Sequence, residues 1–263
     1  MYNFNYVRPA SVADAVKAAG GADARVLAGG QTLLPTMKMR LAKASTVVDL
    51  AGIADLKGVH RNGNAIGIGA MTTHAEVARN ADIKAALPAL AKLAGNIGDA
   101  QVRHRGTIGG SIANNDPAAD YPAAMLALGA TIVTNKRNIT ADQFFTGMFS
   151  TALEPGEIIT GIGIAVPEKA GYAKFEQRAS RYALVGVFVV KTAAGVRVAV
   201  TGAGERGVFR SSELEAALSA NFSAATAAAT KVTASGLMGD LHGKPDYRAA
   251  LISAMAEQAV ATA

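Results

Sequence analysis

Two glycine-rich segments hold the residues of this sequence that are best suited to bind a ligand. The first, Ala28–Leu33, reads Ala-Gly-Gly-Gln-Thr-Leu and joins a predicted strand over Arg25–Leu27 to a predicted helix from Leu33. Paired glycines let the backbone turn tightly and approach a ligand, and the free N–H groups at a helix start attract anions. Gln31 and Thr32 add side-chain donors. The pattern fits a phosphate-binding loop and, about equally well, a plain strand-to-helix turn.

The second segment has its glycine pair, Gly109 and Gly110, between Thr107 and Ser111. We expect Gly106–Pro117 to be a long loop in which backbone N–H groups can form an anion-binding nest. Asp120 follows in the first turn of the predicted helix Ala118–Gly129, where it could cap the helix or accept a sugar hydroxyl. An ordered polar loop would look similar. However, a dinucleotide pyrophosphate needs donors from more than one side, and two such loops supply them.

A third glycine pattern is a weaker candidate for a dinucleotide-binding loop. Gly202–Gly207 has the spacing G-x-G-x-x-G after a predicted strand. The nicotinamide-dinucleotide fingerprint needs a helix that begins within this loop and a second parallel strand after it. Here Val208–Ser212 delays the helix, and more helical sequence follows. We therefore interpret the segment as a strand-to-loop turn.

The sequence offers no complete catalytic set of its own. There is no cysteine, which excludes disulfides, a cysteine nucleophile, thiolate zinc sites and an iron–sulfur cluster ligated by this chain. The four histidines share no ligand spacing, so we expect no metal site; they are His60, His74, His104 and His242. A bound cofactor that carries the chemistry would fit this absence.

The composition favours a globular protein and argues against a nucleic-acid-binding, secreted or membrane-spanning one. The chain has 263 residues, of which 50% are hydrophobic and 17% charged, so it can bury a large core. The net charge of +6 comes from scattered basic residues with few aromatics among them, which argues against nucleic-acid binding. The first residues do not resemble a signal peptide, and apolar runs such as Ala183–Val190 are too short for a membrane span. We expect a soluble cytoplasmic protein.

The elements that must position these segments indicate an α+β fold. Strands and helices alternate up to about residue 55, with a helix over Val12–Ala19 and a strand over Thr46–Leu50. Beyond about residue 168 three strands precede helices, which suggests a separate unit. We predict one domain over 1–168, with subdomains of about 1–55 and 56–168, and a C-terminal α/β domain over 169–263. Its three-stranded sheet is predicted over Tyr172–Arg178, Leu184–Lys191 and Val196–Thr201.

Taken together, the two glycine motifs resemble the FAD-binding medium subunit of molybdenum hydroxylases. This family includes xanthine dehydrogenase, carbon monoxide dehydrogenase and aldehyde oxidoreductase. The likeness covers nearly the whole chain and continues through Gln101–Gly106, Glu157–Ile159, Tyr172–Lys174 and Asp246–Arg248. It implies a two-subdomain FAD-binding domain of the vanillyl-alcohol-oxidase (PCMH) type, followed by the C-terminal domain.

The resemblance also implies roles for individual residues. The first motif would hold the FAD pyrophosphate through main-chain N–H groups, the second would hold it from the other side, and Asp120 would bond the ribose or ribityl part. Ile159 would pack near the flavin ring, Lys174 would lie beside its pyrimidine edge, and Tyr182 stands where eukaryotic relatives have an acidic residue. The implied cofactor-binding residues are Leu27, Ala28, Gly29, Gly30, Gln31, Thr32, Leu33, Thr107, Gly109, Gly110, Ser111, Asp120, Ile159 and Lys174.

The function implied by the resemblance is electron transfer within a heterotrimer. A large partner subunit with molybdopterin would hydroxylate the substrate, and a small partner with [2Fe–2S] clusters would pass electrons to FAD and on to an external acceptor. The complex would be a dimer of heterotrimers, and this chain would not be catalytically complete alone. Two alternatives remain open at this point: a self-contained FAD-dependent oxidase or reductase, and a nonenzymatic nucleotide-binding or scaffold module.

Overall fold

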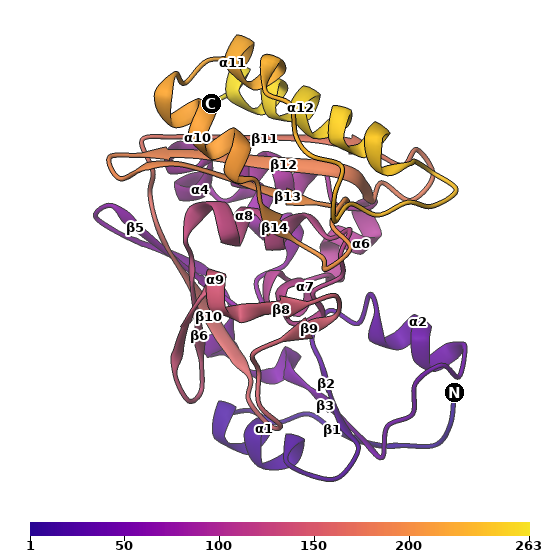
Figure 1. Ribbon diagram of the computed structural model, residues 1–263. Coiled ribbons are helices and arrows are strands. Elements are labelled where there is room, and N and C mark those ends of the chain that lie inside the picture. The colour runs from indigo at the N-terminus through magenta and orange to yellow at the C-terminus, as the bar shows by residue number, and fades with distance from the viewer.

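A computed structural model describes residues 1–263 and shows three main sheets with their helices (Figure 1), together with a small two-stranded sheet formed by β8 (Phe145–Gly147) and β9 (Ser150–Thr151). The first is a parallel sheet in the order β1-β3-β2, in which Leu27 at the end of β2 is paired with Asp49 of β3. Helix α1 has the predicted bounds because Ser11 caps it, accepting from the Asp14 N–H at 3.1 Å. The elements are β1 (Asn5–Val7), α1 (Val12–Ala19), β2 (Ala24–Leu27), α2 (Leu33–Lys38), β3 (Thr46–Asp49) and the short 3₁₀ turns Leu50–Gly52 and Ala54–Leu56.

The second sheet is antiparallel, in the order β4-β5-β10-β6-β7. Its helices share with it the largest apolar core of the molecule. A capping box formed by Thr73 and Glu76 begins α3. The elements are β4 (Val59–Asn62), β5 (Ala65–Gly69), α3 (His74–Arg79), α4 (Ala81–Ala86), α5 (Pro88–Gly95), α6 (Ala100–Arg105), α7 (Ile108–Asn114), α8 (Asp120–Leu128), β6 (Thr131–Thr134), β7 (Asn138–Thr140), α9 (Ala141–Phe144), β8 (Phe145–Gly147), β9 (Ser150–Thr151) and β10 (Ile159–Ala165).

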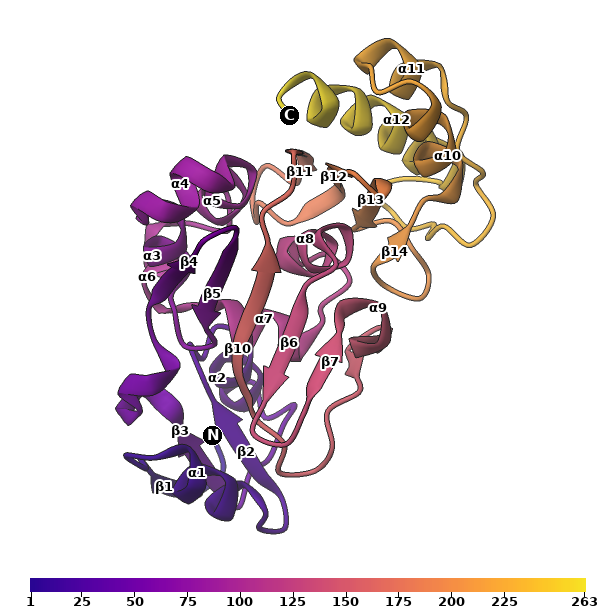
Figure 2. The same ribbon diagram turned by 90° about the vertical axis from the view of Figure 1, so that its left-hand side faces the viewer.

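The third sheet is antiparallel in the order β11-β12-β13-β14, so the predicted three-stranded sheet has a fourth strand. β14 was missed because it has two residues and no alternating pattern to reveal it. Helices α10 to α12 cover the outer face, and α8 lies against the inner face (Figure 2). The elements are β11 (Lys169–Glu176), β12 (Ala183–Thr192), β13 (Gly195–Thr201), β14 (Phe209–Arg210), α10 (Ser212–Ala220), α11 (Ala224–Ala229) and α12 (Pro245–Ala261).

The inner face of this third sheet belongs to the central core. Tyr172, Phe188 and Ala199, from three of its strands, pack in the same apolar cluster as α7 and α8. The strand β12 is buried from Ala183 to Val190, which explains its unbroken apolar run. The C-terminal sheet is thus built against the middle of the molecule. The sheets confirm the predicted α+β class, while the domain limits at residues 55 and 168 stay a prediction.

The prediction of a long loop over Gly106–Pro117 is wrong for the middle of this segment. Residues Ile108–Asn114 form α7, with Thr107 as its N-cap. Ile108 and Ile112 lie one helical turn apart and are fully buried, so packing against the core outweighs the poor helix propensity of the two glycines. None of the helices has the length and apolar character required to cross a bilayer.

Candidate cofactor site

The first glycine motif presents a run of unused backbone donors. It leaves β2 at Leu27 and enters α2 at Leu33, with Gly30 at a φ of +75°. The N–H groups of all residues from Ala28 to Leu33 donate to no acceptor in the protein. The Thr32 side chain is exposed and does not cap the helix, whereas the Gln31 amide donates to Gly29 O at 3.2 Å. Such consecutive free donors at a helix start suit a phosphate or pyrophosphate.

The second motif uses its backbone donors internally. Ile108 N–H donates to Thr72 O at 3.1 Å, and Gly109 N–H donates to Ala70 O at 2.9 Å. The Gly110 N–H is taken by the Thr107 hydroxyl at 3.2 Å, the usual N-cap bond. These N–H groups therefore fix α7 in place and are not free for a ligand.

Ser111 is the free polar group of the second motif. Its N–H bonds to Thr107 O at 3.0 Å within the first turn, but its half-buried hydroxyl makes no hydrogen bond in the protein. The free group that this motif offers is thus a side chain, at a position fixed by the helix.

The glycines bring the two motifs into contact. A Cβ on Gly29 would lie 2.2 Å from Arg105 O, just before the second motif, and one on Gly110 would lie 3.1 Å from the Cβ of Ala28. Only glycine permits such an approach of two backbones. The structure therefore assembles the two segments at one place, as a dinucleotide site requires.

Asp120 and Lys174 form a buried ion pair. The Lys174 amine lies 3.0 Å from Asp120 Oδ1, and the two side chains are 3% and 5% exposed. Burial raises the pKa of Asp120, and the nearby Lys174 ammonium and Tyr172 hydroxyl oppose this rise. Lys174 also donates to Asn96 O and Arg181 O, each at 2.9 Å, so its three N–H bonds all have acceptors.

Tyr172 is a partner of Asp120 that the sequence interpretation missed. Its hydroxyl donates to Asp120 Oδ1, and burial raises the pKa of this phenol above its usual value. The sequence contained a signal for this contact: Tyr172 and Lys174 are two residues apart on one predicted strand, so their side chains point to the same face of the sheet. Tyr182 is half-exposed, and its pKa is raised by burial and by the carboxylates of Asp116 and Asp120.

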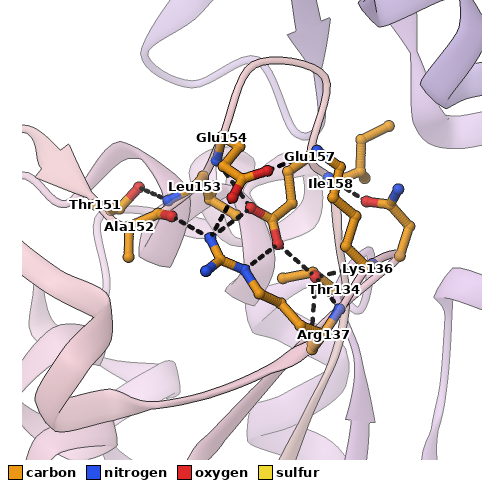
Figure 3. A network of polar contacts seen from close by, with 10 residues as sticks. Thr134, Lys136, Arg137, Thr151, Ala152, Leu153, Glu154, Glu157 and Ile158 are labelled. Carbon is orange, nitrogen blue, oxygen red and sulfur yellow. Dashed lines mark hydrogen bonds and ion pairs between the residues drawn. The ribbon is translucent and has the colours of Figure 1, made fainter.

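Ile159 begins β10 and is buried in the central core. Two residues before it, Glu157 is held by a network of polar contacts (Figure 3). The side chain of Glu157 is fully buried; Arg137 donates to both its oxygens at 3.0 Å, and Thr134 Oγ1 donates at 2.7 Å. These bonds, led by that from Arg137, lower the pKa of Glu157 to about 2. The network fixes the backbone just before the first residue of β10.

Comparison with known proteins identifies the class of the chain. Residues 2–168 match the family described as the FAD binding domain in molybdopterin dehydrogenase, so the chain belongs to this family. The site has what this cofactor needs, since FAD carries an anionic pyrophosphate and the first motif has a run of free N–H donors.

Particular relatives extend the match over nearly the whole chain. The carbon monoxide dehydrogenase medium chain of Afipia carboxidovorans is 43% identical over 73% of this chain and 70% of the relative. The nicotine 6-hydroxylase medium subunit of Paenarthrobacter nicotinovorans is 35% identical over 98% and 96%. Among solved structures, quinoline 2-oxidoreductase from Pseudomonas putida 86 superposes with a TM-score of 0.90 at 29% identity, covering 99% of this chain and 96% of that chain. The predicted family, oxidoreductase class and FAD cofactor are confirmed.

Proposed function

We propose that this chain is the FAD-binding electron-transfer subunit of a heterotrimeric molybdopterin-dependent hydroxylase. Its partners are a large molybdopterin subunit and a small subunit with [2Fe–2S] clusters, in a dimer of heterotrimers. The chain has no cysteine, so every thiolate ligand of such clusters must come from a partner. When bound, FAD supplies the redox chemistry that accepts electrons from the clusters and delivers them to an external acceptor.

One observation carries the proposal: the free N–H groups from Ala28 to Leu33 form an anion cradle against the second motif. In the proposal these groups, which follow Leu27, bind the pyrophosphate, and Gly29 and Gly30 allow the tightly packed turn that directs the N–H groups toward it. Thr107, Gly109 and Gly110 hold α7 in place against the cradle. Ser111 adds its free hydroxyl from that side.

The buried pair of Asp120 and Lys174 has a different role in the proposal. Asp120 accepts a hydroxyl of the ribose or ribityl part, while Lys174 places a positive charge beside the flavin, where it favours an anionic ring. Ile159, which is buried in the central core, packs near the flavin ring, and the network of Glu157 fixes the backbone just before it. The chain itself contributes no acid, base or nucleophile to the substrate reaction.

The test is the purification of the chain alone and together with its co-expressed partners. We expect yellow protein with a flavin absorption spectrum, and hydroxylase activity toward an aldehyde, carbon monoxide or an N-heterocycle only in the assembled complex. Protein that stays colourless in both preparations and takes up no added FAD would contradict the cofactor site. Hydroxylase turnover by this chain alone would contradict the subunit role.

A further inference from the structure

The end of β13 is bonded to the turn that leads into α8. Thr201, which is fully buried, directs its hydroxyl at Ala119 O at 2.6 Å and Pro117 O at 3.0 Å. The next residue, Gly202, donates its N–H to Pro117 O at 2.7 Å. No other group of the protein donates to Ala119 O. Since Ala119 is the N-cap of α8, these bonds set where the helix begins, one residue before Asp120.

A buried arginine holds the same end of β13 from the other side. Arg248 of α12 is 2% exposed, and its Nη1 donates to Gly202 O at 2.7 Å and to Leu184 O at 2.8 Å. Its Nη2 lies 2.8 Å from Asp240 Oδ2, so the charge is paired. Gly202 has a φ of +82°, and a Cβ there would lie 2.5 Å from Ala183 O. This strand end therefore has little freedom to move.

The position of Asp120 is thus determined by the C-terminal sheet from two strands. β11 contacts the carboxylate directly through Tyr172 and Lys174, and β13 fixes the backbone just before it through Thr201. A carboxylate must be held to a fraction of an ångström to accept a ligand hydroxyl well, and such precision comes from the groups that support it. Loss of the Thr201 hydroxyl would leave the half-buried Ala119 O without a donor in the protein.

We propose that Thr201 is a positioning residue for FAD binding: it holds the Pro117–Ala119 turn so that Asp120 meets the cofactor, with Arg248 fixing Thr201's strand. This inference rests on the proposed function, in which Asp120 accepts a hydroxyl of FAD. Neither Thr201 nor Arg248 touches the cofactor in this account. The C-terminal domain then acts on the cofactor site through Asp120.

The experiment compares Thr201→Val, Thr201→Ser and Thr192→Val in the full-length protein, alone or in its complex, whichever binds FAD. Thr192 is the matched control, because it lies on the same sheet and its hydroxyl bonds only within its own hairpin, donating to Gly195 O and accepting from the Ala194 N–H. We expect Thr201→Val to weaken FAD binding about tenfold, the effect of one lost hydrogen bond. Thr201→Ser, which keeps the hydroxyl, should stay within about threefold of the wild type, and Thr192→Val should bind FAD as the wild type does.

The dissociation constant for FAD and the melting temperature are measured on the same samples. If Thr201→Val melts earlier but binds FAD as tightly as the wild type, Thr201 has only a structural role and the proposal is wrong. A failure of the wild type to bind FAD would instead overturn the proposed function.

A second measurement on the wild type covers the case in which Thr201→Val does not fold. Hydrogen exchange of the Gly202 N–H, which bonds to Pro117 O, is followed with and without FAD. The proposal predicts slower exchange at Gly202 and at residues 118–120 when FAD is added, because the ligand stabilises the clamped turn. Unchanged exchange at these amides in FAD-saturated protein would overturn it.

Discussion

The two glycine motifs look alike in sequence and differ in structure. In the first, the backbone donors from Ala28 to Leu33 have no acceptor in the protein. In the second, the N–H groups of Ile108, Gly109 and Gly110 all have one. The first is therefore open to a ligand, while the second is a rigid helix start whose glycines serve close packing. A glycine pair signals close approach of the backbone, and its surroundings decide whether a ligand or the protein itself fills the space.

This difference changes the reason why a side chain would harm the first motif. The sequence suggests that a residue such as valine at Gly30 would block the approach of the pyrophosphate. In the structure a Cβ at Gly30 would point inward, 2.8 Å from Leu34 Cδ1 and 3.1 Å from Leu27 Cδ1. The expected damage is a displaced loop with misdirected donors, reinforced by the positive φ that a β-branched residue rarely adopts.

The largest expected effect comes from Gly30→Val. It should weaken FAD binding about 100-fold or more, since several hydrogen bonds to a charged group are lost together. Titration of apoprotein with FAD, followed by flavin fluorescence, measures this. Gly63→Val is the control, because Gly63 also has a positive φ but has open space around it. Normal flavin occupancy in Gly30→Val would refute the assignment of the first motif.

In the second motif, Gly109→Ala should act on stability. The new Cβ would lie 2.6 Å from both the Cβ and the carbonyl oxygen of Ala70. We expect a loss of about 2 kcal/mol in the free energy of unfolding by urea, as for other overpacked sites. Gly95→Ala, in α5 with ordinary space around it, should cost nothing. A Gly109→Ala protein with full stability and weak FAD binding would show that the second motif binds the ligand through its backbone.

The stabilisation that the Glu157 network gives to the second motif should be lost in acid. A chain of contacts connects Glu157 to this motif. Glu157 fixes the backbone at the start of β10. Further along β10, Thr160 O accepts from the Ala70 N–H, and Ala70 O in turn accepts from the Gly109 N–H. The pKa of Glu157 is lowered to about 2 from its ordinary value of 4.5. Between these values the unfolded chain binds more protons than the folded one. The stabilisation by Glu157 is therefore complete above pH 4.5 and is lost as the pH falls toward 2.

Glu157→Gln should remove this pH dependence. At pH 7 we expect a loss of about 2 kcal/mol, less than the pKa shift alone implies, because the half-exposed Arg137 is screened by solvent. Urea denaturation at several pH values should show the difference from the wild type shrinking below pH 4.5. Glu154→Gln, at the exposed end of the same network, is the control and should change little. Equal pH profiles for the wild type and Glu157→Gln would contradict the role of the network.

The smallest expected effect is that of Ser111→Ala. Removal of this free hydroxyl should weaken FAD binding about threefold to tenfold, the effect of a single hydrogen bond, with no loss of stability. Isothermal titration of the variant with FAD measures it, with exposed Ser235→Ala as the control. A loss of stability without a change in affinity would place Ser111 among the structural residues of α7.

Local signals made much of the fold predictable. Ser11 and the glycines after Ala19 define α1, and the capping box of Thr73 and Glu76 defines the start of α3. The failures arise where tertiary contacts decide. The segment after Thr107 is helical because its isoleucines are buried in the core, and β14 exists only as a partner of β13.

The sequence and the family resemblance nominate the residues of the candidate site, but they do not reveal the hydrogen bonds and ion pairs that join these residues. Both glycine motifs and Asp120 can be picked out from the sequence, and Lys174 from the family resemblance, yet neither shows that an ion pair joins helix α8 to strand β11. Thr201 carries no motif of its own, and its importance appears only when its hydroxyl is found at Ala119 O. Long-range pairing of this kind depends on the assembled fold and leaves no periodic trace in the sequence.

Backbone hydrogen exchange of the two motifs, measured with and without FAD, tests the central claim most directly. We predict fast exchange from Ala28 to Leu33 in the free protein and strong protection on FAD binding, because the ligand gives these N–H groups their first acceptors. Ile108, Gly109 and Gly110 should exchange slowly in both states. FAD binding that leaves the first motif fast, or that protects only the second, would contradict the account.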